Sequence, residues 1–145
     1  MKRLMVMALL ATLIFACSKG NENARQLIIG QWKYDTQAIL DDANKRNMSD
    51  QDKLLVQGTM AVYKDAVFNF KADSTLVIIS NGINQFGSWK MSENGKTLFL
   101  NLSGQDQPNT VSSISSGRIV LAPDPQRGIR YSRIFIPTTG ATGQE

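Results

Sequence analysis

The second half of the chain is a series of short segments with strand periodicity, and this feature restricts the fold more than any other. From residue 67 onward, alternating or β-branched runs are separated every few residues by turn-forming residues. Asn81-Gly82 is the strongest of the hairpin signals. The predicted strands cover residues 68–71, 75–80, 85–91, 97–102, 110–115, 118–122 and 130–136. Strands at this spacing predict an antiparallel meander.

Two further patterns precede this meander. Residues 27–34 alternate between one face that holds Trp32 and Tyr34 and another that is polar, which predicts a first strand. Residues 37–66 have helical spacing instead, and Ser49 with an aspartate three residues later resembles a capping box. We therefore expect two short helices, joined by a turn, between the first two strands.

The expected fold is mainly β: an antiparallel up-and-down barrel of about eight strands, with the helical pair inserted after the first. Closure of the sheet would remove the unpaired edges that promote aggregation. We expect this domain to cover residues 27–137, followed by a disordered tail over residues 138–145.

The first sixteen residues have the layout of a secretory signal. Lys2 and Arg3 precede an apolar run over residues 4–15, which is too short to span a bilayer. Residues 14–17, Ile-Phe-Ala-Cys, resemble the lipobox of bacterial lipoproteins, in which the cysteine is diacylated and becomes the new N-terminus. We expect residues 1–16 to be removed, and acyl chains on Cys17 to anchor the protein to a lipid bilayer.

The segment after the cysteine indicates how the protein is tethered and in which membrane it lies. Residues 17–26 are small and polar, and we expect them to form a flexible tether. Ser18 does not resemble the aspartate that retains some lipoproteins in the inner membrane, so the outer membrane of the cell envelope is favoured. Whether the domain faces the periplasm or the cell surface stays open.

The composition excludes several classes of function. Without Lys2 and Arg3, the 16 basic residues become 14 against 12 acidic ones, and this net charge of +2 is too small to indicate nucleic-acid binding. Histidine is absent from the sequence and acylation would occupy the one cysteine, so we expect no metal site, no cofactor and no enzyme activity. Asp41 and Asp42 are adjacent on a predicted helix and should diverge instead of forming a catalytic pair.

A four-residue pattern, Gly-x-Trp-Lys, occurs at residues 30–33 and again at residues 87–90. Glycine lets a backbone bend or approach another closely, and tryptophan two residues later can cover the end of a barrel. The first copy, the meander and the arginines of residues 130–133 resemble the lipocalin and calycin group. More narrowly, the chain is similar to small lipocalin-like lipoproteins of Bacteroidetes-type bacteria.

This resemblance implies particular roles for individual residues. Trp32 would close the bottom of the barrel, and Arg130 or Arg133 would lie across its ring. The helical pair resembles the lid of fatty-acid-binding proteins. In those proteins an R-x-Y pair holds the ligand carboxylate, whereas here Arg130 and Tyr131 are adjacent and should point to opposite faces. The fatty-acid pairing is therefore not expected.

Two functions fit these observations. In the first, the barrel holds a small apolar or amphipathic ligand, with Arg133 at its polar end and aromatic residues around it: Trp32, Tyr34, Phe68, Phe70 and Trp89. In the second, the same aromatic residues fill the barrel, and the protein presents its surface to envelope proteins or acts as a structural subunit. An internal void of roughly 300 Å³ or more lined by these residues would favour the first function.

Overall fold

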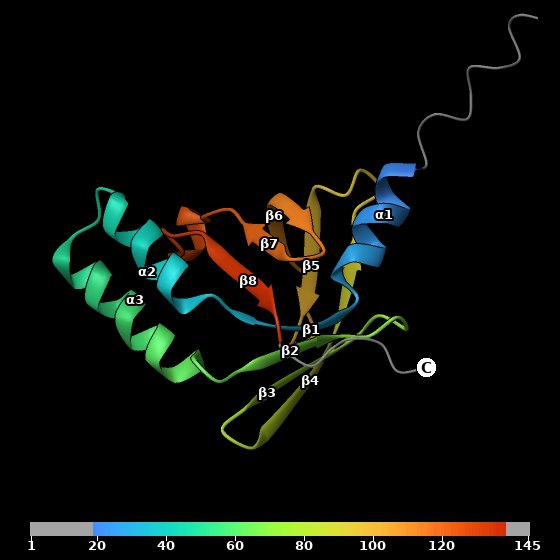
Figure 1. The fold of residues 1–145 in the computed structure, drawn as a ribbon, viewed down its shortest axis with the longest axis horizontal. Helices are drawn as coiled ribbons and strands as arrows, with labels where there is room; N and C mark the ends of the chain where they lie inside the picture. Colours follow the sequence, from blue (N-terminus) through green and yellow to red (C-terminus); the bar gives the residue numbers. More distant parts are fainter. Residues whose placement is uncertain (1–18, 139–145) are drawn as a thin grey trace, which may run out of the picture.

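The computed structural model describes residues 19–138 and the side chains from residue 23 onward (Figure 1). Three helices are α1 (Lys19–Ile28), α2 (Thr36–Lys45) and α3 (Asp50–Tyr63), and a 3-10 turn, η1, covers Pro125–Arg127. The strands are β1 (Gly30–Tyr34), β2 (Val67–Phe70), β3 (Thr75–Ser80), β4 (Ile83–Met91), β5 (Thr97–Asn101), β6 (Gln107–Ser115), β7 (Arg118–Leu121) and β8 (Arg133–Pro137).

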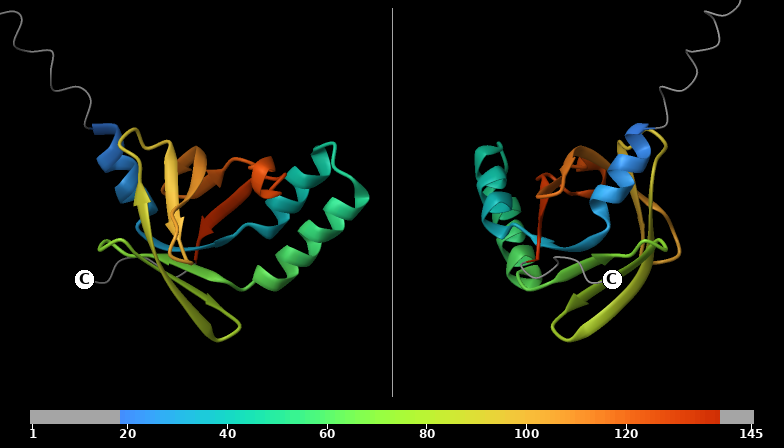
Figure 2. Two further views of the ribbon diagram at one scale, coloured as in Figure 1. Left: turned by 180° about the vertical axis from the view of Figure 1, so that it is seen from behind. Right: turned by 45° about the vertical axis from the view of Figure 1, so that its right-hand side comes forward.

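The eight strands form one closed antiparallel barrel in chain order, and this confirms the predicted fold class (Figure 2). Each strand pairs with its neighbours along the chain, and β1 closes the barrel by pairing with β8. The β3–β4 hairpin turns at Asn81 and Gly82, whose φ angles of 51° and 75° are those of the turn that an Asn-Gly pair favours. The helical pair lies between β1 and β2, as predicted.

The helical pair packs against the outside of the barrel wall. Ile39, Val56 and Met60 form a second core with Ile134 of β8, separate from the barrel interior. Ser49 caps α3 because its hydroxyl oxygen accepts a hydrogen bond of 3.1 Å from the backbone N–H of Asp52. The Asp52 carboxylate accepts from the Ser49 hydroxyl at 2.8 Å instead of from its backbone N–H, so the N-cap half of the predicted capping box is formed. None of the helices within residues 19–138 is long and apolar enough to cross a membrane.

The segment before β1 differs from the sequence interpretation. Residues expected to form a tether are helical from Lys19 to Ile28, and the first strand begins at Gly30 instead of residue 27. Ala24 and Ile28 lie one helical turn apart, and both are buried. Tertiary contacts therefore stabilise this helix, and its polar composition does not predict them. The predicted signal, residues 1–16, and most of the predicted tail, residues 139–145, lie outside the described residues.

Candidate functional site

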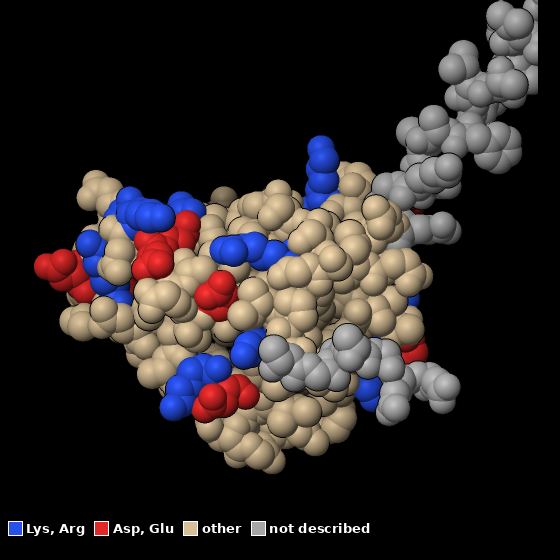
Figure 3. Space-filling model, in the orientation of Figure 1, with Lys and Arg blue, Asp and Glu red and all other residues tan. Residues whose placement is uncertain are grey.

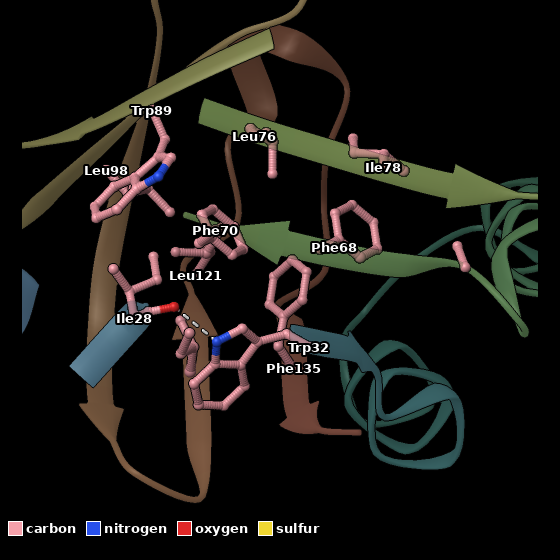
Figure 4. Packing of buried hydrophobic residues seen from close by; sticks show 12 residues of the cluster. Ile28, Trp32, Phe68, Phe70, Leu76, Ile78, Trp89, Leu98, Leu121 and Phe135 are labelled. Carbon is pink, nitrogen blue, oxygen red and sulfur yellow. Dashed lines mark hydrogen bonds between the residues drawn. The ribbon is translucent and has the colours of Figure 1, made fainter. Parts of the chain in front are cut away.

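Helix α1 closes one end of the barrel, and both tryptophans lie there. The indole N–H of Trp32 donates to the carbonyl oxygen of Ile28 at 2.8 Å (Figure 4). The indole N–H of Trp89 donates to the carbonyl oxygen of Lys71 at 3.0 Å. The first bond ties β1 to the end of α1, and the second ties β4 to the β2–β3 turn. Trp32 therefore packs under α1 at this end of the barrel.

An arginine covers Trp89 instead of Trp32, and it comes from α1 instead of the C-terminal segment. The Arg25 guanidinium lies 4.9 Å from the centre of the Trp89 ring and donates to the carbonyl oxygen of Ala72 at 2.8 Å. The predicted contact of Arg130 or Arg133 with Trp32 is wrong. Trp32 pairs with Pro137 of β8, four residues beyond Arg133 and therefore about 13 Å along the strand.

The predicted ligand-binding aromatics form the deep interior of the barrel. Trp32, Phe68, Phe70 and Trp89 are between 2 and 5 % exposed. Phe70 meets Trp89 edge-on at 5.8 Å between ring centres, and Phe68 meets Phe135 in the same way at 5.2 Å (Figure 4). Side chains such as Leu76, Ile119 and Leu121, each 0 to 1 % exposed, fill the space between these rings. These rings therefore form a packed core.

Four pockets lined by described residues open to the surface. Their volumes lie between 130 and 350 Å³, and none is lined by Phe68, Phe70 or Trp89, whereas Trp32 lines one of them and Ile78 another. The 350 Å³ pocket lies between α2 and the outer face of β8, where Ile134 forms part of its wall. A ligand among the deep aromatic rings would have to displace packed side chains.

The opposite end of the barrel carries a buried positive charge. Arg133 lies directly opposite Leu121 on the neighbouring strand and two residues before Phe135, both of which face the interior, so its side chain also points inward. Its Nε and Nη2 atoms are buried without a hydrogen-bond partner among residues 19–138. Burial lowers the pKa of Arg133, yet an arginine keeps its charge at neutral pH. Arg133 is thus a partly buried cation that forms no salt bridge within residues 19–138.

Tyr34 and Tyr131 lie near this guanidinium, and Tyr63 lies beside Tyr34. We call these residues the Arg133 cluster: Tyr34, Tyr63, Tyr131 and Arg133. Burial raises the pKa of Tyr34 from 10.0 to about 12, although the charge of Arg133 acts to lower it. Burial likewise raises the pKa of Tyr131, again against the effect of Arg133. The ring of Tyr63 meets that of Tyr34 edge-on at 6.3 Å. At neutral pH Tyr34 and Tyr131 are therefore uncharged and can donate hydrogen bonds.

Other charges near the cluster are already paired. Asp124 raises the pKa of Arg133 and Arg127 lowers it, but the Arg127 Nε atom lies 2.5 Å from an Asp124 carboxylate oxygen. Arg127 also donates to the side-chain oxygen of Asn109 at 2.9 Å. These groups bond to one another, so Asp124 acts on Arg133 only through its charge and without a hydrogen bond.

An apolar groove adjoins the cluster through Tyr63. This pocket has a volume of 210 Å³ and lies between the end of α3 and the β3–β4 hairpin, lined by Val62, Tyr63, Ile78, Ser80, Asn81, Ile83 and Gln85. Of the Arg133 cluster, Tyr63 alone lines this groove. Arg133 and Tyr34 were predicted from the sequence as ligand-binding residues. Tyr63 and Tyr131 were not, because they come from a helix and a loop whose positions the sequence does not indicate.

The remaining predicted residues stay apart from this end. Asp41 accepts a hydrogen bond from Gln37 at 2.9 Å, whereas Asp42 accepts one from Arg46 at 2.7 Å and one from the backbone N–H of Ser132 at 2.8 Å, so the two carboxylates point to different partners. Among residues 19–138 no three acidic side chains come close enough to hold a metal ion. Cys17, the predicted lipidation site, lies outside the described residues.

Comparisons with known proteins give one structural similarity. No protein-family model matches the chain, and no curated protein matches it. A solved structure of a DUF4847 family protein from Bacteroides vulgatus ATCC 8482 is similar, with 13% sequence identity and a TM-score of 0.47 over 75% of this chain and 92% of that chain.

Proposed function

We propose that this protein binds a small amphipathic molecule with an anionic group at the open end of its barrel. The observation that carries the proposal is the guanidinium of Arg133, buried at the mouth with two unpartnered nitrogen atoms. A buried donor without a partner costs about 1–3 kcal/mol, and more when it is charged. An anionic oxygen at this position would remove that cost and accept two hydrogen bonds from the planar guanidinium.

The surroundings of Arg133 set the size and polarity of the ligand. Tyr34 and Tyr131 are neutral donors at pH 7, so they favour an anion over a cation. The groove beside Tyr63 offers an apolar wall for the rest of the molecule. Because the deep interior is packed, the ligand would occupy the mouth of the barrel instead of its full depth. A short amphiphile fits these limits better than a long acyl chain.

A titration with matched probes tests this proposal. A soluble form that begins at Ser18 would be titrated with decyl sulfate, decanol and decyltrimethylammonium, which share a tail and differ in charge. We expect decyl sulfate to bind most tightly, and Arg133→Met to weaken it by at least about tenfold. Arg130→Met is the matched control, because Arg130 is exposed and pairs with Asp52 at 3.4 Å. Equal binding of all three probes, or unchanged binding by Arg133→Met, would contradict the proposal.

We also infer that the protein is a lipid-anchored component of the cell envelope, held in the outer membrane by Cys17. The leader and lipobox-like residues support this inference, and α1 begins only two residues after the cysteine, which would keep the barrel close to the bilayer. Replacing Cys17 with serine should release the protein or leave it as an uncleaved precursor. Unchanged partitioning of this variant into detergent would contradict the anchor.

A second candidate function rests on the filled interior. If the Arg133 cluster binds no ligand, the packed barrel would serve as a rigid support that presents a surface to envelope proteins or to a larger assembly. This candidate predicts that protein purified from its host carries no bound small molecule. Native mass spectrometry of that material separates the two functions, because the first predicts a retained anionic amphiphile.

A further inference from the structure

Helix α2 packs against the start of β8, the strand that carries Arg133 (Figure 1). The backbone N–H of Asp35, at the N-terminus of this helix, donates to the carbonyl oxygen of Ile134 at 2.9 Å. The Ile134 side chain also packs against Ile39 in the second core. The residue after Arg133 is therefore held against α2 both by a backbone hydrogen bond and by apolar contact.

Ser132, the residue before Arg133, is held by the other end of the same helix. Asp42 accepts a hydrogen bond from the backbone N–H of Ser132 at 2.8 Å, and the Nη2 atom of Arg46 donates to the Ser132 hydroxyl at 3.0 Å. Arg46 also binds the Asp42 carboxylate through two nitrogen atoms, at 2.7 and 3.1 Å. Ser132 itself is only 8 % exposed. We call these three residues the Ser132 clamp: Asp42, Arg46 and Ser132.

The Ser132 clamp differs from an ordinary surface ion pair. Acidic and basic side chains lie side by side over the end of the molecule that carries α2 and α3 (Figure 3). Arg130 and Asp52 form one such pair, with a contact of 3.4 Å, and exposed pairs of this kind contribute little to stability. In the clamp, two parallel bonds fix the guanidinium and the carboxylate relative to each other, so both can bind one further residue.

Arg133 needs support from outside the sheet because it is the last paired residue at its end of β8. It lies opposite Leu121 of β7, whereas the pairs between β8 and β1 end at Phe135. Strand ends that lack cross-strand bonds open more readily than strand centres. Ser132 and Ile134 are held on the outer side by α2, so the residue between them points into the barrel.

We propose that the Ser132 clamp positions the Arg133 guanidinium for the anionic group of the ligand, an inference that rests on the proposed function. A binding group is precise only when neighbouring bonds fix its backbone and rotamer. The clamp supplies such bonds from outside the barrel, and they join α2 to the residue next to Arg133. Asp42 and Arg46 are therefore positioning residues, which affect ligand affinity through Arg133.

Replacing Asp42 separates positioning from simple electrostatics, because the two predict opposite results. Loss of a carboxylate would by itself favour the binding of an anion. In Asp42→Asn, however, the amide NH2 group faces the donors of Arg46, and the one remaining oxygen cannot hold both Arg46 and Ser132 as the carboxylate does. Positioning therefore predicts weaker binding of an anion. Asp41→Asn is the matched control, because it removes the same charge and leaves the clamp intact.

Titration of the soluble form that begins at Ser18, which keeps every described residue, tests the proposal. We expect Asp42→Asn to weaken the binding of decyl sulfate by about threefold or more and to leave decanol unchanged. Asp41→Asn should bind decyl sulfate at least as tightly as wild type. In an Arg133→Met background, Asp42→Asn should have no further effect. Unchanged or tighter binding of decyl sulfate by Asp42→Asn, equal weakening of both probes, or the same loss without Arg133 would overturn the proposal.

The side-chain NMR signal of Arg133 separates this proposal from the proposed function. Its Nε–H signal, assigned by its loss in Arg133→Met, should exchange slowly with water because the Nε atom is buried. We expect Asp42→Asn to shift this signal or to speed its exchange, and Asp41→Asn to leave it unchanged. If wild type shows this behaviour but does not prefer decyl sulfate, the proposed function fails and the positioning of Arg133 stands. An Arg133 signal that Asp42→Asn leaves unchanged would overturn the positioning.

Discussion

Burial raises the pKa of the Tyr34 hydroxyl, and the charge of Arg133 acts to lower it. Burial raises the pKa from 10.0 to about 12, so the neutral phenol is favoured by the folded state. Stability from this effect is complete below pH 10 and is lost as the pH rises towards 12. We expect the ultraviolet absorbance of tyrosinate to show a late ionisation that Tyr34→Phe removes. Ionisation of Tyr34 at its ordinary pH in the folded protein would contradict this placement.

Gly87 shows why the second Gly-x-Trp-Lys copy needs its glycine. A Cβ atom at this position would overlap the carbonyl oxygen of Asn101 on the paired strand and lie 2.8 Å from the Leu102 side chain. The backbone atom cannot move aside without disturbing β4–β5 pairing, so Gly87→Ala should destabilise the fold by about 2 kcal/mol or more. Gly117→Ala is the control, because a Cβ there meets nothing within 4 Å. Chemical denaturation compares the two, and equal stabilities would refute the close approach.

The two copies of this pattern illustrate what single residues reveal in a sequence. A glycine two residues before a tryptophan predicted a close backbone approach, and Gly87 confirms it. The partners of the tryptophans could not be predicted, because the Arg25 that covers Trp89 belongs to a segment with no strand or helix signal of its own. The approach of Tyr131 to Arg133 and of Tyr63 to Tyr34 could not be predicted either, because it depends on how distant elements pack together.

At the scale of elements, local chemistry predicted the turns and caps well. The Asn-Gly hairpin and the Ser49 cap lie where the sequence placed them, because the residues that form them also satisfy their hydrogen bonds. Element boundaries that depend on tertiary contacts were less accurate. Strand β8 begins at Arg133 instead of residue 130, since a bridge between Asp124 and Ile129 holds the preceding segment in a loop. Helix α1 was missed for the same reason.

Asp42 links α2 to Ser132, the residue before β8, through a hydrogen bond. Its charge state should therefore affect the free energy of unfolding. Although burial acts to raise it, hydrogen bonds from Arg46 and Ser132 hold the pKa of Asp42 below its usual value of 3.8. The lowered pKa adds stability above pH 3.8, which is lost as the pH falls through the lowered value.

We expect Asp42→Asn to reduce the free energy of unfolding by about 1 kcal/mol at pH 7, after screening by solvent, and to flatten the acid dependence of stability. Asp41→Asn should change little, because the hydrogen bond that Asp41 accepts comes from Gln37 of its own helix. Urea denaturation at several pH values measures both variants. An Asp42→Asn protein as stable as wild type at neutral pH would show that this link does not hold α2.

For the whole molecule, hairpin spacing was enough to predict an eight-stranded closed barrel, since a meander of short strands has few other ways to avoid free edges. Whether side chains fill the interior of the barrel could not be predicted from the sequence. Eight strands enclose barely enough room for side chains, so the volumes of particular rings decide between a core and a cavity. Here the aromatic rings form a packed core, and the groove at Tyr63 lies outside it.

We propose that Arg133 binds an anionic group and does not stabilise the fold. The most direct test is the free energy of unfolding of Arg133→Met relative to wild type, in protein stripped of bound lipid. Because methionine removes an unpaired buried charge while keeping an apolar side chain, we predict a variant more stable by about 1–2 kcal/mol. A variant less stable than wild type would assign the arginine a structural role and contradict the account.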